Sequence, residues 1–260
     1  MITCLSKNRN DVYINMLAKG ANLPVTDYHD DLPATPVVIR SLAKADILKY
    51  RKENNLPFYY MDTGYTGGHE IVTKEDLKPI HRIVYNDLQL GEITPRPDDR
   101  WKKFKHNIND RRTNGKYILI VPPSDKPCKY YNINVDTWIP EVKKEIRKYT
   151  DRPIKIRLKK SRQYRRKIKP IYADLQDCHA LVTYQSIAAI ESILYGVPAF
   201  TLAPCAADPV ADKDLSQLEE PTVQDRDKIH KWAHHLAYGQ FHIDEMKTGT
   251  AYRILTNENS

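Results

Sequence analysis

Residues 179–200 carry the pattern with the clearest chemistry in this chain: a short apolar strand, a polar turn at 184–186 and a helix of about ten residues. We expect Ser186 to be the N-cap of this helix and Gly196 to end it. At the carboxyl end of a strand, the N–H groups of the first helical turn favour an anion such as a diphosphate. Glu191, more than a helical turn further along, could accept hydrogen bonds from a ribose diol. The alternative is an ordinary buried strand–helix–strand unit in which this glutamate binds nothing.

Two α/β blocks, one after the other, are expected to position these residues. In the first block the pattern predicts strands and helices at 1–5, 10–21, 37–39, 42–54, 57–61 and 80–85. In the second block it predicts them at 117–121, 135–149, 154–158, 172–178, 199–202 and 222–238. Residues 87–114 hold few apolar residues and are interpreted as a linker. We expect two domains, 1–112 and 113–260, and leave open that the last helices pack back on the first domain.

The composition is that of a folded globular protein, since 41% of the 260 residues are hydrophobic and 28% are charged. No apolar run approaches the roughly 20 residues that a membrane-spanning helix needs. The first residues lack the pattern of a secretory signal. The four cysteines are scattered without a C-x-x-C pair, which indicates reduced thiols and disfavours a zinc site. We therefore expect a cytoplasmic protein without a bound metal.

Positive charge is concentrated in one segment of the chain. The net charge is +8, and residues 155–169 contain nine Lys and Arg and no acid. Such a run suggests an anionic ligand or a polyanionic partner such as DNA. The candidate nucleic-acid contacts are Lys160, Arg162, Tyr164, Arg165, Arg166 and Lys167. The alternative is a solvated basic surface without a partner.

The order strand, S-x-x-x-x-E-S-I-L-Y-G-V-P, strand in residues 179–200 resembles the donor-binding half of GT-B glycosyltransferases. The resemblance implies that Glu191 binds the donor ribose and that the helix N-terminus faces the diphosphate. The segment Arg157-Leu158-Lys159-Lys160 is similar to a basic strand end in capsule-type members, but it lacks the His and Pro of their usual Arg-x-His-Pro pattern. The first block, with P-F-Y-Y-M-D-T-G-Y at 57–65, resembles small phage-encoded glycosyltransferases, some of which glycosylate hydroxymethylcytosine in DNA.

Transfer from a nucleotide sugar needs a seat for the diphosphate leaving group, and the second block supplies candidates. Backbone N–H groups at the start of the helix, with the cations Arg157 and Lys159, could stabilise the departing diphosphate without a metal. Side chains of the polar turn could contact phosphate oxygens. Ser124 follows another strand of the same expected sheet, although it could also be a simple turn residue. The candidate donor-binding residues are Ser124, Arg157, Lys159, Gln185, Ser186, Ile187 and Glu191.

The base for the acceptor hydroxyl must come from the first block, because GT-B acceptors enter from that side. We choose Asp62, which follows an apolar strand, and we expect partial burial to raise its pKa and suit it to take a proton. The alternative is an Asp that accepts a hydrogen bond within its own turn, from Gly64 or Tyr65. Weaker candidates for the base are Asp27, His29, His69 and Asp87.

Together these patterns predict an α/β protein with two Rossmann-like parallel-sheet domains facing a cleft. The expected activity moves a sugar from a nucleotide donor, expected to be UDP-linked, to a hydroxyl acceptor, expected to be 5-hydroxymethylcytosine in phage DNA. Beyond the nucleotide-sugar co-substrate, no cofactor is expected. Two alternatives stay open: a non-catalytic nucleic-acid-binding protein, and a GT-B-like enzyme that acts on a polysaccharide or epimerises a sugar nucleotide.

Overall fold

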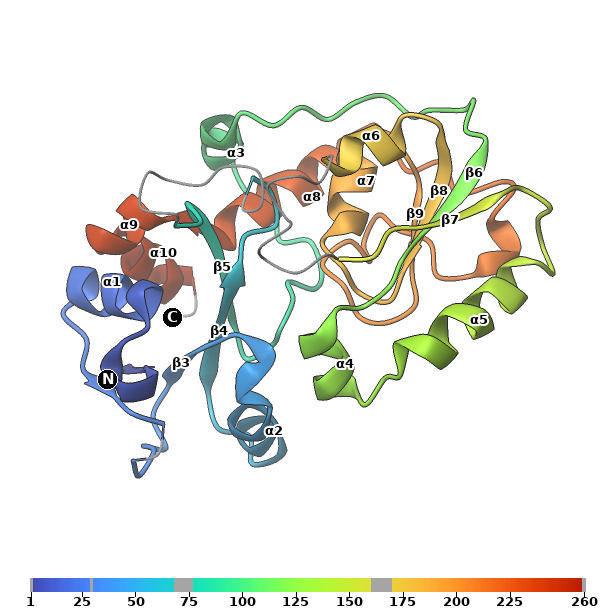
Figure 1. The fold of residues 1–260 in the computed structure, drawn as a ribbon. Coiled ribbons are helices and arrows are strands. Elements are labelled where there is room, and N and C mark those ends of the chain that lie inside the picture. The colour runs from blue at the N-terminus through green and yellow to red at the C-terminus, as the bar shows by residue number, and fades with distance from the viewer. Residues whose placement is uncertain (1, 29, 68–76, 160–169, 259–260) are drawn as a thin grey trace. The chain divides into compact units, whose positions relative to one another are not determined.

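The computed structural model describes residues 2–28, 30–67, 77–159 and 170–258 (Figure 1). The chain divides into two compact units: one joins Met1–Leu90 with Leu236–Ser260, and the other is Gly91–His235. Each unit contains its own β-sheet with helices around it, so the expected α/β class with two sheets is confirmed. The expected domains 1–112 and 113–260 differ from these units at residues 91–112 and 236–260. The segment expected as a linker includes the helix α3 (Asp99–Phe104).

The first unit is built on a six-stranded sheet in the order β10-β5-β4-β3-β1-β2. Its strands are β1 (Thr3–Leu5), β2 (Val25–Thr26), β3 (Val37–Arg40), β4 (Phe58–Thr63), β5 (Ile80–Tyr85) and β10 (Gln240–His242). Strands β2, β1, β3 and β4 are parallel, whereas β5 runs antiparallel to β4 and β10 antiparallel to β5. The carboxyl ends of β1, β3 and β4 therefore meet the start of β5 at one edge of the sheet.

Helices from both ends of the chain cover one face of this sheet. They are α1 (Val12–Ala21), α9 (Ile243–Lys247) and α10 (Thr250–Glu258). Ile14 and Leu17 of α1 pack with Met61 of β4, Phe241 of β10 and Met246 of α9 in one buried cluster. The last helices belong to this core because their apolar side chains have the spacing that puts them on one helical face.

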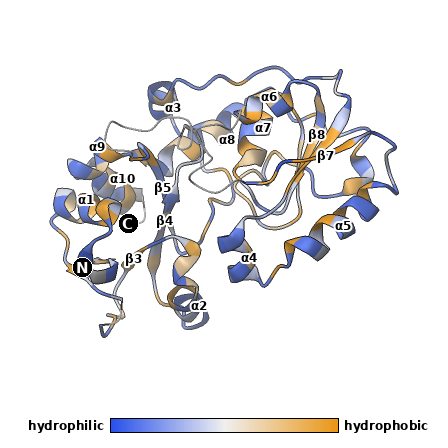
Figure 2. Ribbon diagram, in the orientation of Figure 1, coloured by the Kyte–Doolittle hydropathy of each residue, from blue (hydrophilic) through white to orange (hydrophobic). Residues whose placement is uncertain are grey.

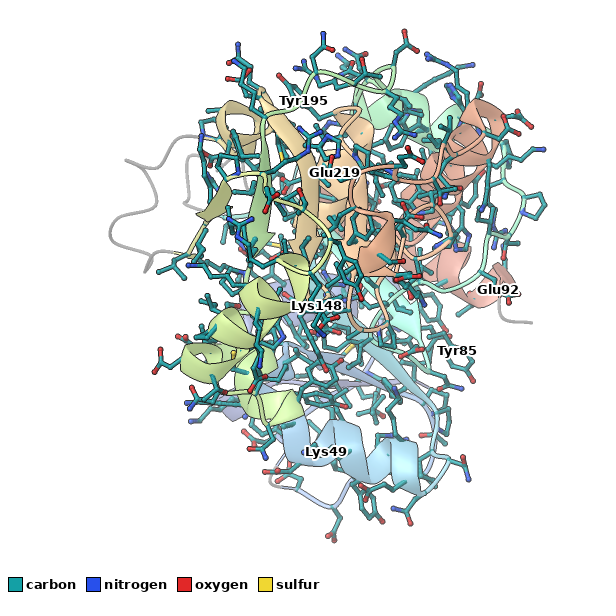
Figure 3. All side chains as sticks on the ribbon, turned by 90° about the vertical axis from the view of Figure 1, so that its right-hand side faces the viewer. Lys49, Tyr85, Glu92, Lys148, Tyr195 and Glu219 are labelled. Atoms are coloured by element: carbon teal, nitrogen blue, oxygen red, sulfur yellow. The ribbon has the colours of Figure 1, made fainter. Side chains whose placement is uncertain are left out.

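Helix α2 (Ala45–Glu53) contributes a buried arginine to the first unit. The Arg51 guanidinium donates hydrogen bonds to the backbone carbonyls of Pro33, Thr35 and Pro57 at 2.7 to 3.1 Å. Its charge is buried among carbonyl dipoles, which are good acceptors for the planar guanidinium. The exposed side of the same helix is polar, and Lys49 lies there (Figure 3).

The second unit is built on a four-stranded sheet in the order β7-β6-β8-β9, and all its strands are parallel. They are β6 (Tyr117–Val121), β7 (Ile154–Ile156), β8 (Cys178–Thr183) and β9 (Ala199–Thr201). The helices are α4 (Asp125–Tyr131), α5 (Val135–Ile146), α6 (Ile171–Leu175), α7 (Ala188–Leu194) and α8 (Arg226–Tyr238), whose last residues enter the first unit. Hydrophobic residues run along β8 (Figure 2), where Ala180 and Val182 pack with Ile120, Phe200 and Ile146.

Several helices are shorter than the sequence pattern predicts. Helix α7 has seven residues, where about ten were expected, and α6 ends at Leu175 because Cys178 already begins β8. The expected helix 42–54 divides into a 3₁₀ turn at Leu42–Lys44 and α2. None of the helices in the described ranges is both long enough and apolar enough to cross a membrane.

Candidate functional site

The carboxyl edge of the second sheet gathers the residues that the sequence assigned to donor binding. Because β6, β7 and β8 are parallel, the turns that follow them lie at the same edge (Figure 1). Those turns contain Ser124, Arg157, Lys159, Gln185, Ser186 and Ile187, and α7 carries Glu191. This edge is where open α/β sheets bind ligands.

The turn between β8 and α7 is tied to its neighbours by hydrogen bonds. The hydroxyl of Thr183 donates to the carbonyl of Val121 on β6 at 2.6 Å. The N–H of Ser186 donates to that same hydroxyl at 3.4 Å, and the Ser186 hydroxyl accepts from the N–H of Ala188 at 3.2 Å. The expected N-cap at Ser186 is wrong by one residue, because α7 begins at Ala188 and Ile187 occupies the cap position without a side-chain cap.

Glu191 lies in the first turn of α7 and is half-buried. The neighbouring Ser192 is fully buried and donates to the carbonyl of Val197 at 3.0 Å, which closes the turn from α7 into β9. Gly196 occupies that turn with a φ of +86°, a conformation that residues with a side chain rarely adopt. The carboxylate of Glu191 is therefore held on a helix whose far end is fixed to the sheet.

Arg157 follows β7, and its guanidinium forms an ion pair with the carboxylate of Asp174 on α6. Its backbone N–H donates to the carbonyl of Ile120 at 2.9 Å, so both main chain and side chain are held. Lys159 lies two residues further on and is exposed. The positive charge of Arg157 is partly compensated within the protein, which reduces what it can offer to a phosphate.

On the first unit, Asp62 lies near the end of β4 at the carboxyl edge of the sheet. Its carboxylate accepts from the hydroxyl of Tyr60 and from the N–H of Thr63, both at 2.7 Å, and it lies 3.9 Å from the guanidinium of Arg82 on β5. Burial alone would raise the pKa of Asp62, but these three partners outweigh it and hold that pKa well below its ordinary value of 3.8. The expected rise in the pKa of Asp62 is therefore wrong. The alternative hydrogen bond from Gly64 or Tyr65 is also wrong, because the Asp62 carboxylate accepts from the N–H of Thr63 instead.

Three residues near Asp62 were not singled out in the sequence. Arg40 ends β3, Lys78 precedes β5, and His81 is the second residue of β5. The Arg40 guanidinium pairs with Asp11 at 2.8 Å, and the Lys78 ammonium donates to the hydroxyl of Thr63 at 2.7 Å. Polar residues at the ends of apolar strands were the signal available, but only the pairing of β4 with β3 and β5 places them beside Asp62.

His81 is fully buried and its ring packs on that of Tyr13, with the ring centroids 4.0 Å apart. Neither ring nitrogen has a hydrogen-bond partner among the residues that the structure describes. Burial, reinforced by the charge of Arg40, lowers the pKa of His81 to about 3. The imidazole is therefore neutral at physiological pH.

Of the weaker candidates for the base, Asp27 and Asp87 lie in the described part of the chain. Asp87 follows β5, which runs antiparallel to β4, so it lies toward the opposite edge from Asp62, and it pairs with Lys52 at 3.1 Å. Asp27 follows the short edge strand β2. His29 and His69 are outside the described residues, as are the six candidate nucleic-acid contacts from Lys160 to Lys167.

Potential metal ligands do not cluster in the described part of the chain, where no group of three His, Cys, Asp or Glu is placed to hold an ion. His230 and His234 have ring centroids 6.2 Å apart on α8. None of the four cysteines, all within the described residues, forms a disulfide, and Cys4, Cys178 and Cys205 are buried.

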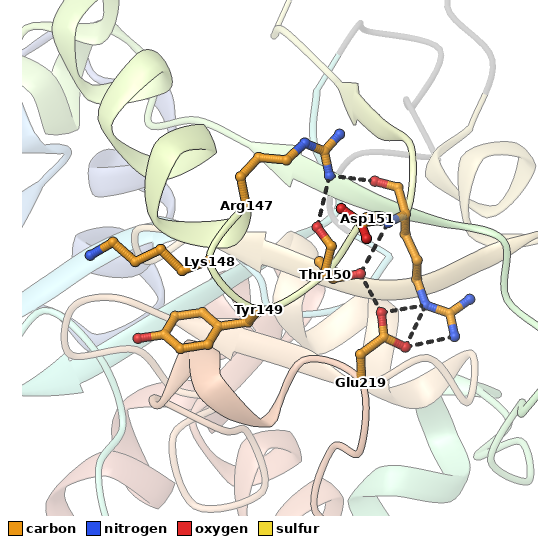
Figure 4. Close-up of a pocket in the computed structure, with 7 residues that line it drawn as sticks. Arg147, Lys148, Tyr149, Thr150, Asp151 and Glu219 are labelled. Atoms are coloured by element: carbon orange, nitrogen blue, oxygen red, sulfur yellow. Dashed lines mark hydrogen bonds and ion pairs between the residues drawn. The ribbon is translucent and has the colours of Figure 1, made fainter.

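A depression of about 520 Å³ lies beside the start of β7, at the amino edge of the second sheet (Figure 4). Arg152 pairs with Glu219 at 2.9 Å and donates to the carbonyl of Gly115, while Arg147 donates to the carbonyls of Thr150 and Arg152. Glu219 and Lys148, both on its rim, are labelled in Figure 3. Because these polar groups bind one another, they hold together the loops that line the depression.

Comparison with known proteins identifies the fold. No protein-family model matches the chain, and no curated protein does. Among solved structures, the chain is similar to a β-Kdo 2,7 transferase, KpsC of Thermosulfurimonas dismutans, with a TM-score of 0.54 and 10% identity over 97% of this chain and 99% of that one. It is also similar to the β-Kdo 2,4 transferase of KpsC from the same organism, with a TM-score of 0.51 and 12% identity over 90% and 89% of the two chains. The chain therefore has the fold of these glycosyltransferases, and the expected GT-B-like fold is confirmed.

Proposed function

We propose that the chain is a glycosyltransferase that moves a sugar from a nucleotide donor to a hydroxyl group of an acceptor. The observation that carries the proposal is the gathering of polar and charged side chains at the carboxyl edge of the second sheet, in a chain with a glycosyltransferase fold. Fold alone does not define activity, so the site residues carry the argument for the reaction.

The second unit is proposed to bind the donor. Glu191 would accept hydrogen bonds from the ribose, and Lys159, with a smaller share from Arg157, would stabilise the negative charge that develops on the leaving phosphate. The assignment is supported by the shared edge of these residues. It needs no metal, since fixed cations can stabilise the leaving group.

The first unit is proposed to bind the acceptor. The lowered pKa of Asp62 favours the ionised carboxylate at neutral pH, so it would accept a hydrogen bond from the acceptor hydroxyl and take its proton as the new C–O bond forms. Tyr60 and Arg82 would hold the carboxylate in position. A low pKa makes Asp62 a weak base, so its main contribution would be to orient the hydroxyl.

Two acceptor classes follow from different observations. The similar solved structures are named as Kdo transferases, which makes an acidic sugar on a saccharide acceptor the first class to test. The basic run at 155–169 supports hydroxymethylcytosine in DNA as the second class. Mass spectrometry of products from nucleotide-sugar panels with each acceptor would separate the two.

Donor binding can be tested by thermal stabilisation with UDP, CMP, GDP and ADP. We expect one nucleotide to raise the melting temperature of the wild type, and Glu191→Ala to lose that rise while Glu220→Ala, an exposed control in the same unit, keeps it. If no nucleotide stabilises the protein but DNA does in a salt-dependent way, the chain is a nucleic-acid-binding protein. Conversion of a UDP-sugar without an acceptor would instead identify an epimerase.

A further inference from the structure

Several polar groups of the turn after β8, at the carboxyl edge of the second sheet, are bonded within the unit. The carbonyls of Thr183 and Tyr184 accept from the N–H groups of Leu202 and Ala203, at 3.0 and 2.9 Å. The carbonyl of Ser186 accepts from the N–H of Ala189 at 3.0 Å. The first two bonds join the turn after β8 to the segment after β9, so these three carbonyls are satisfied from within the unit.

The hydroxyls of the same turn are also engaged. Thr183 donates to Val121, and Ser186 accepts from Ala188. A hydroxyl that accepts one hydrogen bond can still donate its own hydrogen, so a contact from Ser186 to a phosphate oxygen is compatible with its bond to Ala188.

Gln185 is the exception in this turn. Its side chain is only 8% exposed, and its amide oxygen Oε1 is buried without a hydrogen-bond partner in the described part of the structure. A buried carbonyl oxygen without a donor is rare in folded proteins, because it has lost its water without a replacement. Such an atom at a ligand-binding edge indicates a group that arrives with the ligand.

We propose that Gln185 Oε1 accepts a hydrogen bond from an O–H or N–H group on the nucleoside of the donor. This inference rests on the proposed function. Phosphate oxygens are acceptors at neutral pH and have no hydrogen to give to Oε1, so Oε1 needs a different partner, while the Nε2 group of Gln185 can still donate to a phosphate. Ribose hydroxyls and the N–H groups of a base are the donors that such a ligand offers. Glu191 is six residues away on the adjoining helix, which agrees with a nucleoside on this side of the turn.

The chain supplies a matched control. Gln89 also has a buried Oε1 without a partner among the described residues, but it follows β5 in the first unit. Gln→Met at either position keeps the size of the side chain and removes the acceptor. Both variants should fold with a melting temperature equal to or above that of the wild type, because an unsatisfied buried acceptor is lost. Gln185→Leu serves as a second variant at the site.

The test is calorimetric titration with UDP or CMP, whichever the wild type binds, and with its 2′-deoxy, 3′-deoxy and N3-methyl or N4-methyl forms. We expect one of these changes to weaken binding to the wild type by roughly 3- to 10-fold. Gln185→Met should bind the parent nucleotide weaker by a similar factor and show no further loss with that analogue. Gln89→Met should behave as the wild type in every titration.

Two results would overturn the inference and leave the proposed function standing. One is unchanged nucleotide affinity in both Gln185 variants. The other is an equal loss of affinity for inorganic pyrophosphate, which would place the amide on the phosphates. A wild-type protein that binds no nucleotide would overturn the proposed function, and this inference with it.

Discussion

The side chain of Gln240 holds the main chain at Tyr65, 175 positions away in the sequence: its Oε1 accepts the N–H of Tyr65 at 2.8 Å. The same oxygen accepts from the N–H of Thr66 at 3.1 Å, and the Gln240 Nε2 donates to the Thr66 hydroxyl at 2.8 Å. All three bonds are buried. The turn that follows Asp62 is therefore held by a strand from the end of the chain.

Gln240→Leu should lower the free energy of unfolding by roughly 2–4 kcal/mol, because it leaves two buried N–H groups and a hydroxyl without partners. Urea unfolding at neutral pH measures the change. Gln89→Met, which removes an acceptor that has no donor, is the control and should not destabilise. A loss below about 1 kcal/mol in Gln240→Leu would mean that water replaces these bonds.

Asp62→Asn should strongly reduce sugar transfer, because the amide keeps one acceptor oxygen but cannot take the proton. It should leave nucleotide binding as in the wild type, because the carboxylate belongs to the acceptor unit. The ionised form is favoured in the folded state, so Asp62 stabilises the protein above its ordinary pKa of 3.8, and this stabilisation is lost as the pH falls below that value. Between pH 6 and pH 3 the melting temperature of the variant should fall less than that of the wild type. Unchanged turnover in Asp62→Asn would remove this residue from the mechanism.

His81→Phe should make stability less sensitive to mild acid. The folded-state pKa of His81, about 3, lies below the ordinary value of 6.5, so protonation favours the unfolded chain as the pH falls through that window. Between pH 7 and pH 5 the wild type should lose roughly 2 kcal/mol more than the variant, as measured by urea unfolding. The phenyl ring can keep the packing on Tyr13, so the two proteins should be of similar stability at pH 7. Parallel curves for the two proteins would contradict the assignment.

Arg51→Met should destabilise the first unit by roughly 3 kcal/mol or more, because the carbonyls of Pro33, Thr35 and Pro57 lose their shared donor inside the protein. Arg51→Lys should recover only part of the loss, since an ammonium group cannot reproduce the planar fork of five N–H donors. Lys49→Met on the exposed side of the same helix is the matched control, with an expected change within about 0.5 kcal/mol. Equal stability of the two Met variants would show that the hydrogen bonds of Arg51 contribute nothing to the free energy of unfolding.

The sequence by itself determined the features that depend on neighbours along the chain. Alternating and continuous apolar runs predicted most of the strands, and the strand–helix order predicted the parallel sheet of the second unit. Ser124, Arg157 and Gln185 share an edge because each follows a parallel strand, which needs no knowledge of side-chain contacts.

Only the tertiary structure decided how those residues are engaged. Arg82 on β5 lowers the pKa of Asp62, and Gln240 on β10 holds the turn after it. No local pattern in the sequence pairs β5 with β4 or β10 with β5. The ion pair of Arg157 with Asp174 likewise arises from packing of α6 on the sheet. The reason is physical. Apolar spacing along the chain shows where strands and helices lie in the sequence. The protonation state and hydrogen bonding of a site depend instead on groups that folding brings from distant parts of the chain.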